Sequence, residues 1–162
     1  MYYESTRNNK LKKTFSEVLL LGLAEDGGLF IPKKWPKVSK KELSKFENMN
    51  YQQIAFHISK KFIENEINDK DLKKIIRKSF KNFSEKKIAN IKNLGDGKWL
   101  LELFYGPTLA FKDYALQVVG NLFEYVLKKE KKKITIIGAT SGDTGSAAIN
   151  ACKNKRTMEL FI

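Results

Sequence analysis

Hydrophobic residues in the first half of the chain recur at helical spacing. Apolar positions between residues 14 and 24 predict a helix with one wide buried face. A second helix is expected after Asn50, because Asn50 and Gln53 stand at the two positions of a capping box. A third is expected to open at residue 69 or 71, and its apolar residues are Leu72, Ile75, Ile76 and Phe80. Residues 1–87 are therefore expected to form a small, mainly helical domain.

Short extended segments interrupt and follow these helices. Leu29-Phe30-Ile31 comes directly after two glycines and predicts a short strand. Segments 88–94 and 98–104 are apolar and flank the turn signal Gly95-Asp96-Gly97. Both are expected to be extended, while the pattern leaves open whether they pair as a hairpin. A long helix is then predicted by the apolar residues between Ala115 and Leu127.

The last part of the chain has the order strand, glycine loop, helix and strand. Ile134-Thr135-Ile136-Ile137 has the β-branched composition of a buried strand. A loop is expected at Gly138–Gly145, a helix of small residues at 146–151, and another strand from Met158. This order predicts a right-handed βαβ unit with a parallel sheet. Residues 88–162 are therefore expected to be the start of an α/β domain, truncated because little sequence remains to cover both faces of the sheet.

The net charge of +13 allows three interpretations. Clustered basic residues could bind nucleic acid. However, only three of the 31 basic residues are arginine, and the lysines are spread along the chain without forming one stripe. Solvated helix faces therefore explain the charge better, and we expect no nucleic-acid partner. A positive field that attracts small, multiply anionic substrates is the third interpretation.

Cysteine usage and hydropathy limit the compartment and the class of protein. The single cysteine, Cys152, excludes an intramolecular disulfide framework and indicates a reducing compartment, so a cytoplasmic location is expected. One cysteine and one histidine, His57, are too few for a structural zinc site. No apolar run approaches the length of a membrane-spanning helix, and no membrane partner is expected.

The loop "GATSGDTG", Gly138 to Gly145, is the first motif that could carry chemistry. A strand, a glycine loop and a helix N-terminus together present backbone N–H groups to an anion. Thr140, Ser141 and Thr144 add hydroxyl donors. The spacing fits neither a Walker P-loop nor a GxGxxG motif. A glycine-rich turn that only caps the helix is an equally good interpretation of the motif alone.

The second motif is "LELFYGPTLAFKDYALQ", which contains Lys112. A solvated lysine has a pKa of about 10.4 and is a poor nucleophile at neutral pH. Partial burial by Phe111 and its apolar neighbours would lower that pKa and free the amine for imine chemistry. By local chemistry alone, a solvent-facing residue in the first helical turn beside Asp113 is the more economical interpretation.

Together, these two motifs resemble the corresponding segments of threonine synthases, which are pyridoxal-phosphate enzymes of the tryptophan-synthase-β-like fold, fold type II. "YYESTRN" and "TFSEVLLLGLAEDGGLFIPKKWP" resemble the opening domain of the same family. The resemblance extends over essentially the whole chain, with its motifs in the expected order. It implies a small helical first domain followed by the first part of a parallel-sheet domain that binds pyridoxal 5'-phosphate.

The resemblance also implies an activity and its residues. Lys112 matches the lysine that holds pyridoxal 5'-phosphate as an internal aldimine and then shuttles protons at Cα and Cβ. The reaction implied is that of a carbon–oxygen lyase, which converts O-phospho-L-homoserine and water to L-threonine and phosphate. Asp143 would lie near the cofactor's ring oxygen, at a position where many relatives have Asn. The substrate carboxylate would be bound by the loop residues, which are Thr140, Ser141, Gly142 and Thr144. Arg7 is a weaker candidate for the phosphate region.

Two parts of the family pattern are not found before Ile162. These are the cofactor-phosphate loop, rich in Gly and Asn, and the residue that faces the pyridine nitrogen. We therefore expect an N-terminal fragment that is inactive and incompletely folded in its second half. The alternative is a catalytically inactive threonine-synthase-like protein that binds a phosphorylated ligand or a partner. A related β-replacing or dehydratase-type enzyme is disfavoured by "GLAEDGGLFIP", and a basic nucleic-acid-binding module is more remote.

Overall fold

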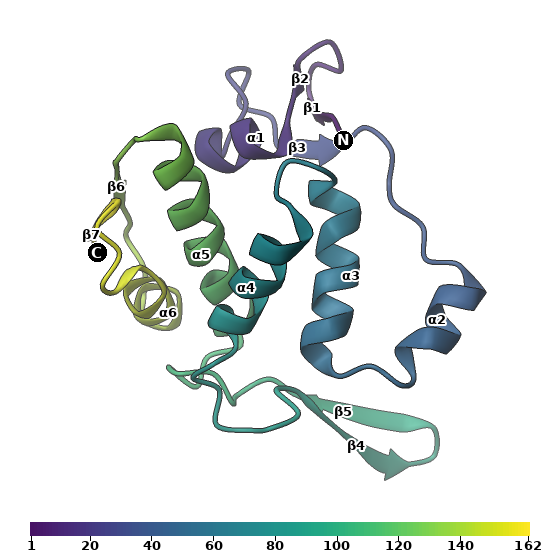
Figure 1. Cartoon of the computed structure of the whole chain (residues 1–162). Helices are drawn as coiled ribbons and strands as arrows, with labels where there is room; N and C mark the ends of the chain where they lie inside the picture. The colour runs from purple at the N-terminus through teal and green to yellow at the C-terminus, as the bar shows by residue number, and fades with distance from the viewer. The chain divides into compact units, whose positions relative to one another are not determined.

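Helices and strands alternate along the chain, and the structure, a computed structural model, describes all of residues 1–162 (Figure 1). They form two units, residues 1–73 and 74–162. The expected mixed α/β class, with a mainly helical first part before a parallel strand pair, is confirmed. The domain boundary expected after residue 87 stays a prediction, because the division into units only describes contacts within this chain.

A three-stranded antiparallel sheet opens the first unit. It consists of β1 (Tyr3–Ser5), β2 (Lys12–Lys13) and β3 (Phe30–Pro32), in the order β2-β1-β3. The sequence predicted β3 to within one residue but not β1 and β2. Segments of two or three residues are too short to show an alternation of apolar and polar positions, and only β3 has a preceding pair of glycines to mark it.

The helix α1 (Phe15–Leu21) is shorter and less buried than expected. It begins at a capping box of Thr14 and Glu17 and ends at Gly22, whose φ of 71° interrupts the helix. Leu23 then forms a bridge with Leu29. None of the helix residues is fully buried, so the predicted span of residues 14–24 and its wide buried face were wrong.

Two further helices of the first unit begin at capping boxes. In α2 (Lys40–Phe46) the pair is Ser39 and Glu42. In α3 (Tyr51–Ile63) it is Asn50 and Gln53, as predicted, with an Asn50 Oδ1 to Gln53 N–H distance of 3.0 Å. Local hydrogen bonding thus sets where each helix starts.

The helix α4 (Asp69–Ser79) carries the strongest apolar face of the chain. Its predicted apolar residues are all buried, and they are Leu72, Ile75, Ile76 and the adjoining Phe80. The prediction succeeded because the 3.6-residue spacing here is uninterrupted by glycine or proline.

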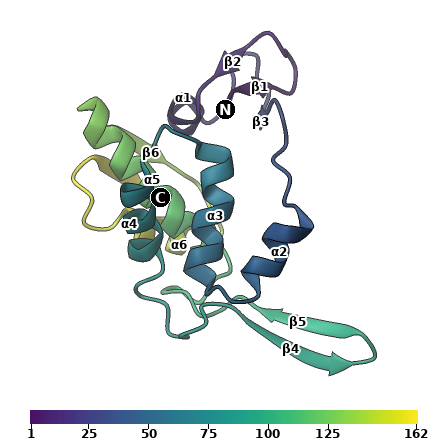
Figure 2. The same cartoon turned by 45° about the vertical axis from the view of Figure 1, so that its right-hand side comes forward.

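A hairpin follows α4 in the second unit. β4 (Asn90–Gly95) pairs antiparallel with β5 (Lys98–Glu102), which settles the question that the sequence left open. Gly95, Asp96 and Gly97 all have positive φ, as the tight turn requires. In Figures 1 and 2 the hairpin projects as a two-stranded ribbon away from the helices of its own unit. Its exposed large apolar residues are Ile91, Leu94, Trp99, Leu100 and Leu101.

The second unit ends in a β-α-β arrangement. β6 (Ile134–Ile137) and β7 (Met158–Phe161) are parallel, and α6 (Asp143–Cys152) joins them, as expected. Two details of the prediction were wrong. The helix begins at Asp143 and not at residue 146, and β6 is not buried, since Ile137 is 82% exposed.

The long helix α5 (Asp113–Glu130) packs on α6. A Cβ on Gly120 would lie 2.7 Å from the carbonyl oxygen of Ala151, so the two helix backbones approach closely at this point. Beside this contact, Gln117 Nε2 donates a hydrogen bond of 2.9 Å to Asn150 Oδ1. None of the helices is both long and apolar enough to cross a membrane.

Candidate functional site

Lys112 stands directly before α5, with a helical backbone (φ −64°, ψ −21°) and no side-chain capping bond. Its side chain is half-buried, and Nζ lies 4.4 Å from the centroid of the Phe111 ring. No ion pair or hydrogen bond joins this ammonium to a carboxylate. The amine therefore lies against an aromatic face and has no carboxylate partner.

The backbone that carries Lys112 is held by its neighbour Asp113. The Asp113 carboxylate is fully buried and accepts hydrogen bonds from Thr108, at 2.8 Å from the backbone N–H and 2.9 Å from the hydroxyl. Gly106 lies against it, and a Cβ there would come within 2.4 Å of Asp113 Cβ. Leu109 takes a left-handed φ of 62° to close the turn. The loop before Lys112 is therefore tied to the first turn of α5.

The apolar enclosure expected around Lys112 is present on one side. Phe111 contacts the ammonium, but the Phe111 ring itself is 58% exposed and Leu109 is 70% exposed. The amine thus lies between an aromatic face and solvent.

The loop after β6 presents unpaired donors. Thr140, Ser141 and Gly142 are exposed, and none of the loop hydroxyls has a hydrogen-bond partner within the chain. Gly142 has φ 142° and supplies no capping side chain to α6. The first-turn N–H groups and the positive end of the helix dipole are therefore free to bind an anion.

The last residues of the motif Gly138 to Gly145 belong to α6. Asp143 is the first residue of α6 and is exposed, while Thr144 is half-buried. A Cβ on Gly145 would lie 2.6 Å from Thr140 Oγ1, so the Thr140 side chain folds over the first helical turn. The missing Cβ of Gly145 thus makes room for Thr140.

Lys112 and the loop lie on helices that contact each other, but no contact joins them directly. Lys112 is five residues before Gln117 in α5, and Asp143 is seven residues before Asn150 in α6. The Gln117–Asn150 hydrogen bond holds these two positions of the helices together. The roles predicted for Lys112, Asp143 and the loop stay predictions.

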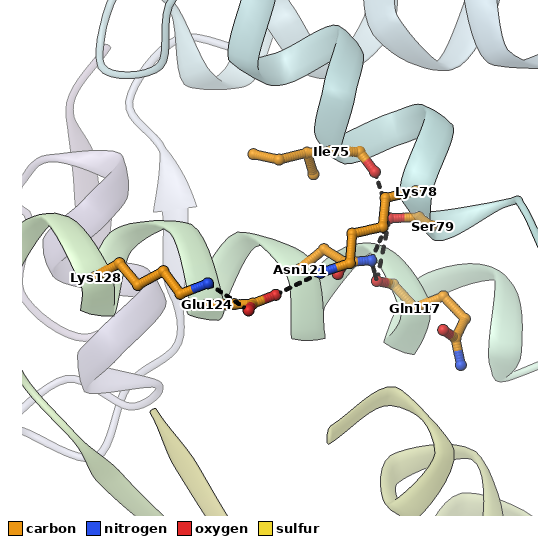
Figure 3. A network of polar contacts seen from close by, with 7 residues as sticks. All are labelled: Ile75, Lys78, Ser79, Gln117, Asn121, Glu124 and Lys128. Atoms are coloured by element: carbon orange, nitrogen blue, oxygen red, sulfur yellow. Dashed lines mark hydrogen bonds and ion pairs between the residues drawn. The ribbon is translucent and has the colours of Figure 1, made fainter. Parts of the chain in front are cut away.

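A buried polar network supports α5 from its other side (Figure 3). Asn121 Nδ2 donates to Ser79 Oγ at 3.0 Å and to the Gln117 carbonyl at 2.9 Å. Ser79 Oγ in turn donates to the carbonyls of Ile75 and Gln117. This network fixes α5 against α4, and Gln117 extends it to α6.

A second cluster, which the sequence did not single out, precedes the Lys112 loop. The buried carboxylate of Glu102 pairs with Lys92 Nζ at 2.6 Å and accepts a hydrogen bond from the Tyr105 hydroxyl. Lys92 and Tyr105 hold the pKa of Glu102 below its usual value, and Glu102 raises the pKa of Tyr105. The only local signal was a charged residue within the apolar segment "WLLELF".

Comparisons with known proteins agree in naming one family. The family described as "Threonine synthase N terminus" matches residues 2–80. A threonine synthase from Pseudomonas aeruginosa is 43% identical over all of this chain and 34% of its own length. Threonine synthase-like 2 from Xenopus laevis is 40% identical, again over 100% of this chain and 34% of that protein. The chain therefore spans about a third of the length of these curated relatives.

The similarity extends to the fold. The crystal structure of a PLP-bound threonine synthase from Brucella melitensis superimposes with a TM-score of 0.96 at 36% sequence identity. The match covers 100% of this chain and 35% of that one. Both units of this chain, including the loop before Lys112 and the loop before α6, thus have counterparts in that structure.

Proposed function

Since the chain belongs to the threonine synthase family, we propose that it supplies Lys112 and the loop of residues 140–144 to a threonine synthase active site. The reaction is the conversion of O-phospho-L-homoserine and water to L-threonine and phosphate, and the enzyme class is that of a pyridoxal-phosphate-dependent carbon–oxygen lyase. The observation that carries the proposal is the unpaired Lys112 ammonium on a loop fixed by the buried Asp113. A cytoplasmic location is part of the proposal, supported by the free thiol of Cys152.

The residues around Lys112 fit pyridoxal phosphate. Its amine has no carboxylate partner, one side is open to solvent, and the adjoining Phe111 face can pack against a flat ring. When bound, the cofactor supplies an electron sink for proton removal beside the substrate amine. Lys112 would hold the cofactor through its ε-amino group, and the same amine would move protons at the substrate's Cα and Cβ.

The loop before α6 has the donors that a substrate carboxylate needs. Hydroxyls of Thr140, Ser141 and Thr144 and the first-turn N–H groups around Gly142 bind and orient that carboxylate. Asp143 lies at the start of the helix, where its carboxylate faces solvent and can approach the ring oxygen of the cofactor. Fixing the carboxylate and the amine orients the Cα proton toward Lys112.

Borohydride trapping tests the assignment of Lys112. The chain is incubated with pyridoxal phosphate and reduced, and the labelled peptides are counted by mass spectrometry. Lys112 should carry most of the label, although the chain has 28 lysines. Lys112→Ala should abolish the dominant labelled peptide, whereas the exposed control Lys133→Ala should not. Equal labelling of many lysines in the unaltered chain would contradict the assignment.

A catalytically inactive ligand-binding protein is the second candidate. Its supporting observation is the 40% identity to Threonine synthase-like 2 from Xenopus laevis. Both candidates predict binding of phosphorylated ligands, but only the first requires the Lys112 amine. An assay for threonine formed from O-phospho-L-homoserine separates them, provided that the remaining part of the enzyme's site is supplied.

A further inference from the structure

Two ammonium groups form ion pairs with a single carboxylate, Glu124 in α5, and a third lies within its electrostatic influence. Glu124 accepts from Lys78 Nζ through Oε2 and from Lys128 Nζ through Oε1, each at 2.7 Å. Figure 3 shows Glu124 between the two lysines, one on α4 and one on α5. Glu124 is the only carboxylate that acts on the third lysine, Lys155. The two lysines already bound to Glu124 leave it little capacity to neutralise another charge.

Lys155 is half-buried and is not neutralised. Burial and the positive charge of Lys78 lower the pKa of its ammonium, and the attraction of Glu124 only partly offsets them. Burial also raises the pKa of the neighbouring Cys152 thiol, which therefore adds no negative charge at neutral pH. Arg156 follows in sequence, exposed and without an ion pair. With Lys78, Lys128 and Glu124, these groups carry a net charge of +3.

These two unneutralised side chains, Lys155 and Arg156, line a shallow cavity of about 490 Å³ that is largely open to solvent. Its other lining residues are Cys152, Asn154 and Met158. The turn between α6 and β7 fixes their backbone. Asn154 adopts a left-handed φ of 62°, Lys155 N–H donates to the Cys152 carbonyl at 3.2 Å, and Met158 N–H donates to the Lys155 carbonyl at 3.2 Å. The backbone under both cationic side chains is thus ordered before any ligand binds.

This cavity lies away from the proposed substrate site. It adjoins the start of β7, whereas the loop of residues 138–142 follows the end of the parallel strand β6. Because β6 and β7 run in the same direction, the two sites lie at opposite ends of the strand pair, one at its N-terminal end and one at its C-terminal end. An anion bound in the cavity is therefore neither the substrate carboxylate nor the cofactor.

We propose that the cavity formed by residues 152–158 binds a small phosphate-bearing anion with two or more negative charges. Unneutralised ammonium and guanidinium groups in a concave site match such a ligand, because hydrogen bonds between charged partners are stronger than neutral ones. The cavity walls contain no aromatic residue and only one arginine. Single-stranded nucleic acid is bound through stacking on aromatic side chains, so a small anion fits the site better.

Calorimetric titration with inorganic pyrophosphate at constant ionic strength tests the proposal. The cavity of the unaltered chain should bind pyrophosphate with a Kd of about 1 mM or tighter. Lys155→Met keeps the length of the side chain and should weaken binding about tenfold. Arg156→Gln should weaken it similarly, and because Arg156 is exposed this variant should fold normally. Glu124→Gln removes the one opposing carboxylate and should tighten binding severalfold.

Two controls distinguish binding in this cavity from non-specific attraction by surface lysines and from binding at the proposed active site. Lys86→Gln with Lys87→Gln removes two exposed lysines of the same unit outside the cavity, and binding should not change. Ser141→Ala, in the loop before α6, should also leave pyrophosphate binding intact, whatever it does to the proposed enzyme. The proposal would be overturned if pyrophosphate up to 10 mM (about tenfold above the expected Kd) gave no heat of binding. It would also be overturned if the Lys86/Lys87 control lost as much affinity for pyrophosphate as the Lys155 and Arg156 variants. Binding of a 20-nucleotide single strand, but not of pyrophosphate, through Lys155 and Arg156 would overturn it too.

Discussion

The carboxylate of Asp113 accepts both the backbone N–H and the hydroxyl of Thr108, five residues earlier in the chain. This pair closes the loop that ends at Lys112, with Gly106 packed against the same carboxylate. The geometry of the proposed reactive lysine is therefore set by its buried neighbour and not by contacts of its own amine. The same pair of residues gives the first testable consequence.

Asp113→Ala should lower the free energy of unfolding by about 2–3 kcal/mol, because it leaves the partly buried donors of Thr108 without an acceptor. Thr108→Val removes only the hydroxyl and should cost about 1 kcal/mol. Urea unfolding followed by circular dichroism measures both. Equal effects of the two variants would contradict the central position given to the Asp113 carboxylate.

Gly120→Ala tests the close contact of α5 with α6. Alanine favours a helix interior over glycine by about 1 kcal/mol, but the added Cβ would meet the Ala151 carbonyl at 2.7 Å. Backbone cannot move aside as a flexible side chain can, so we expect net destabilisation of about 1–2 kcal/mol. Lys129→Ala, at an exposed position of the same helix, is the control and should change stability little. If Gly120→Ala proved more stable than the unaltered chain, α5 and α6 could move apart at little cost in free energy.

The buried network of Figure 3 should show energetic coupling. Asn121 Nδ2 donates to Ser79 Oγ, while Asn121 Oδ1 is buried without a partner. Ser79→Ala and Asn121→Leu should each destabilise the fold, and the double variant should cost about 1 kcal/mol less than the sum of the two. A double-mutant cycle in urea measures this coupling. Additive effects would mean that the two side chains act independently.

Acid should weaken the contact between α2 and α3 of the first unit. The ammonium of Lys61 and the N–H of Ser39 lower the pKa of Glu42 from 4.5 to about 2. A carboxylate whose pKa is depressed by folding stabilises the fold above its unfolded pKa, and this contribution disappears as the pH falls through the folded value. Stability should therefore decline between about pH 5 and pH 2.

Thermal melts at a series of pH values measure this decline. Glu42→Gln should flatten the dependence in the acid range, whereas Glu47→Gln, at an exposed position just after α2, should leave it unchanged. If both variants retain the full slope, other carboxylates carry the acid sensitivity.

Sequence reasoning succeeded where structure depends on nearby residues. The Asn50–Gln53 capping box and the apolar face of α4 involve contacts between residues three or four apart, and both were predicted. It failed for β1 and β2, whose two or three residues carry no flanking glycine signal, whereas β3 follows Gly27-Gly28 and was predicted. The start of α6 was misplaced because Gly145, a poor helix former, lies within its first turn.

The candidate site was predictable in part for the same reason. Lys112 and residues 140–144 stood out through their motifs and the family resemblance. The part played by Asp113 did not, since it depends on the left-handed turn at Leu109 that brings Thr108 back to the helix. The cavity at Lys155 and Arg156 was not predicted, because Lys78 and Glu124 come from distant segments. In the sequence, nothing distinguishes Lys155 from the other 27 lysines.

The exposed apolar hairpin of β4 and β5 has a consequence for the colloidal behaviour of the chain. Its large side chains, Trp99 and Leu101 among them, favour self-association, whereas the net charge of +13 keeps molecules apart. Salt shortens the range of this repulsion to about 8 Å at physiological ionic strength without weakening apolar contact. The chain should therefore stay dispersed in dilute buffer and cluster as salt is added, the reverse of what charge-driven complexes do.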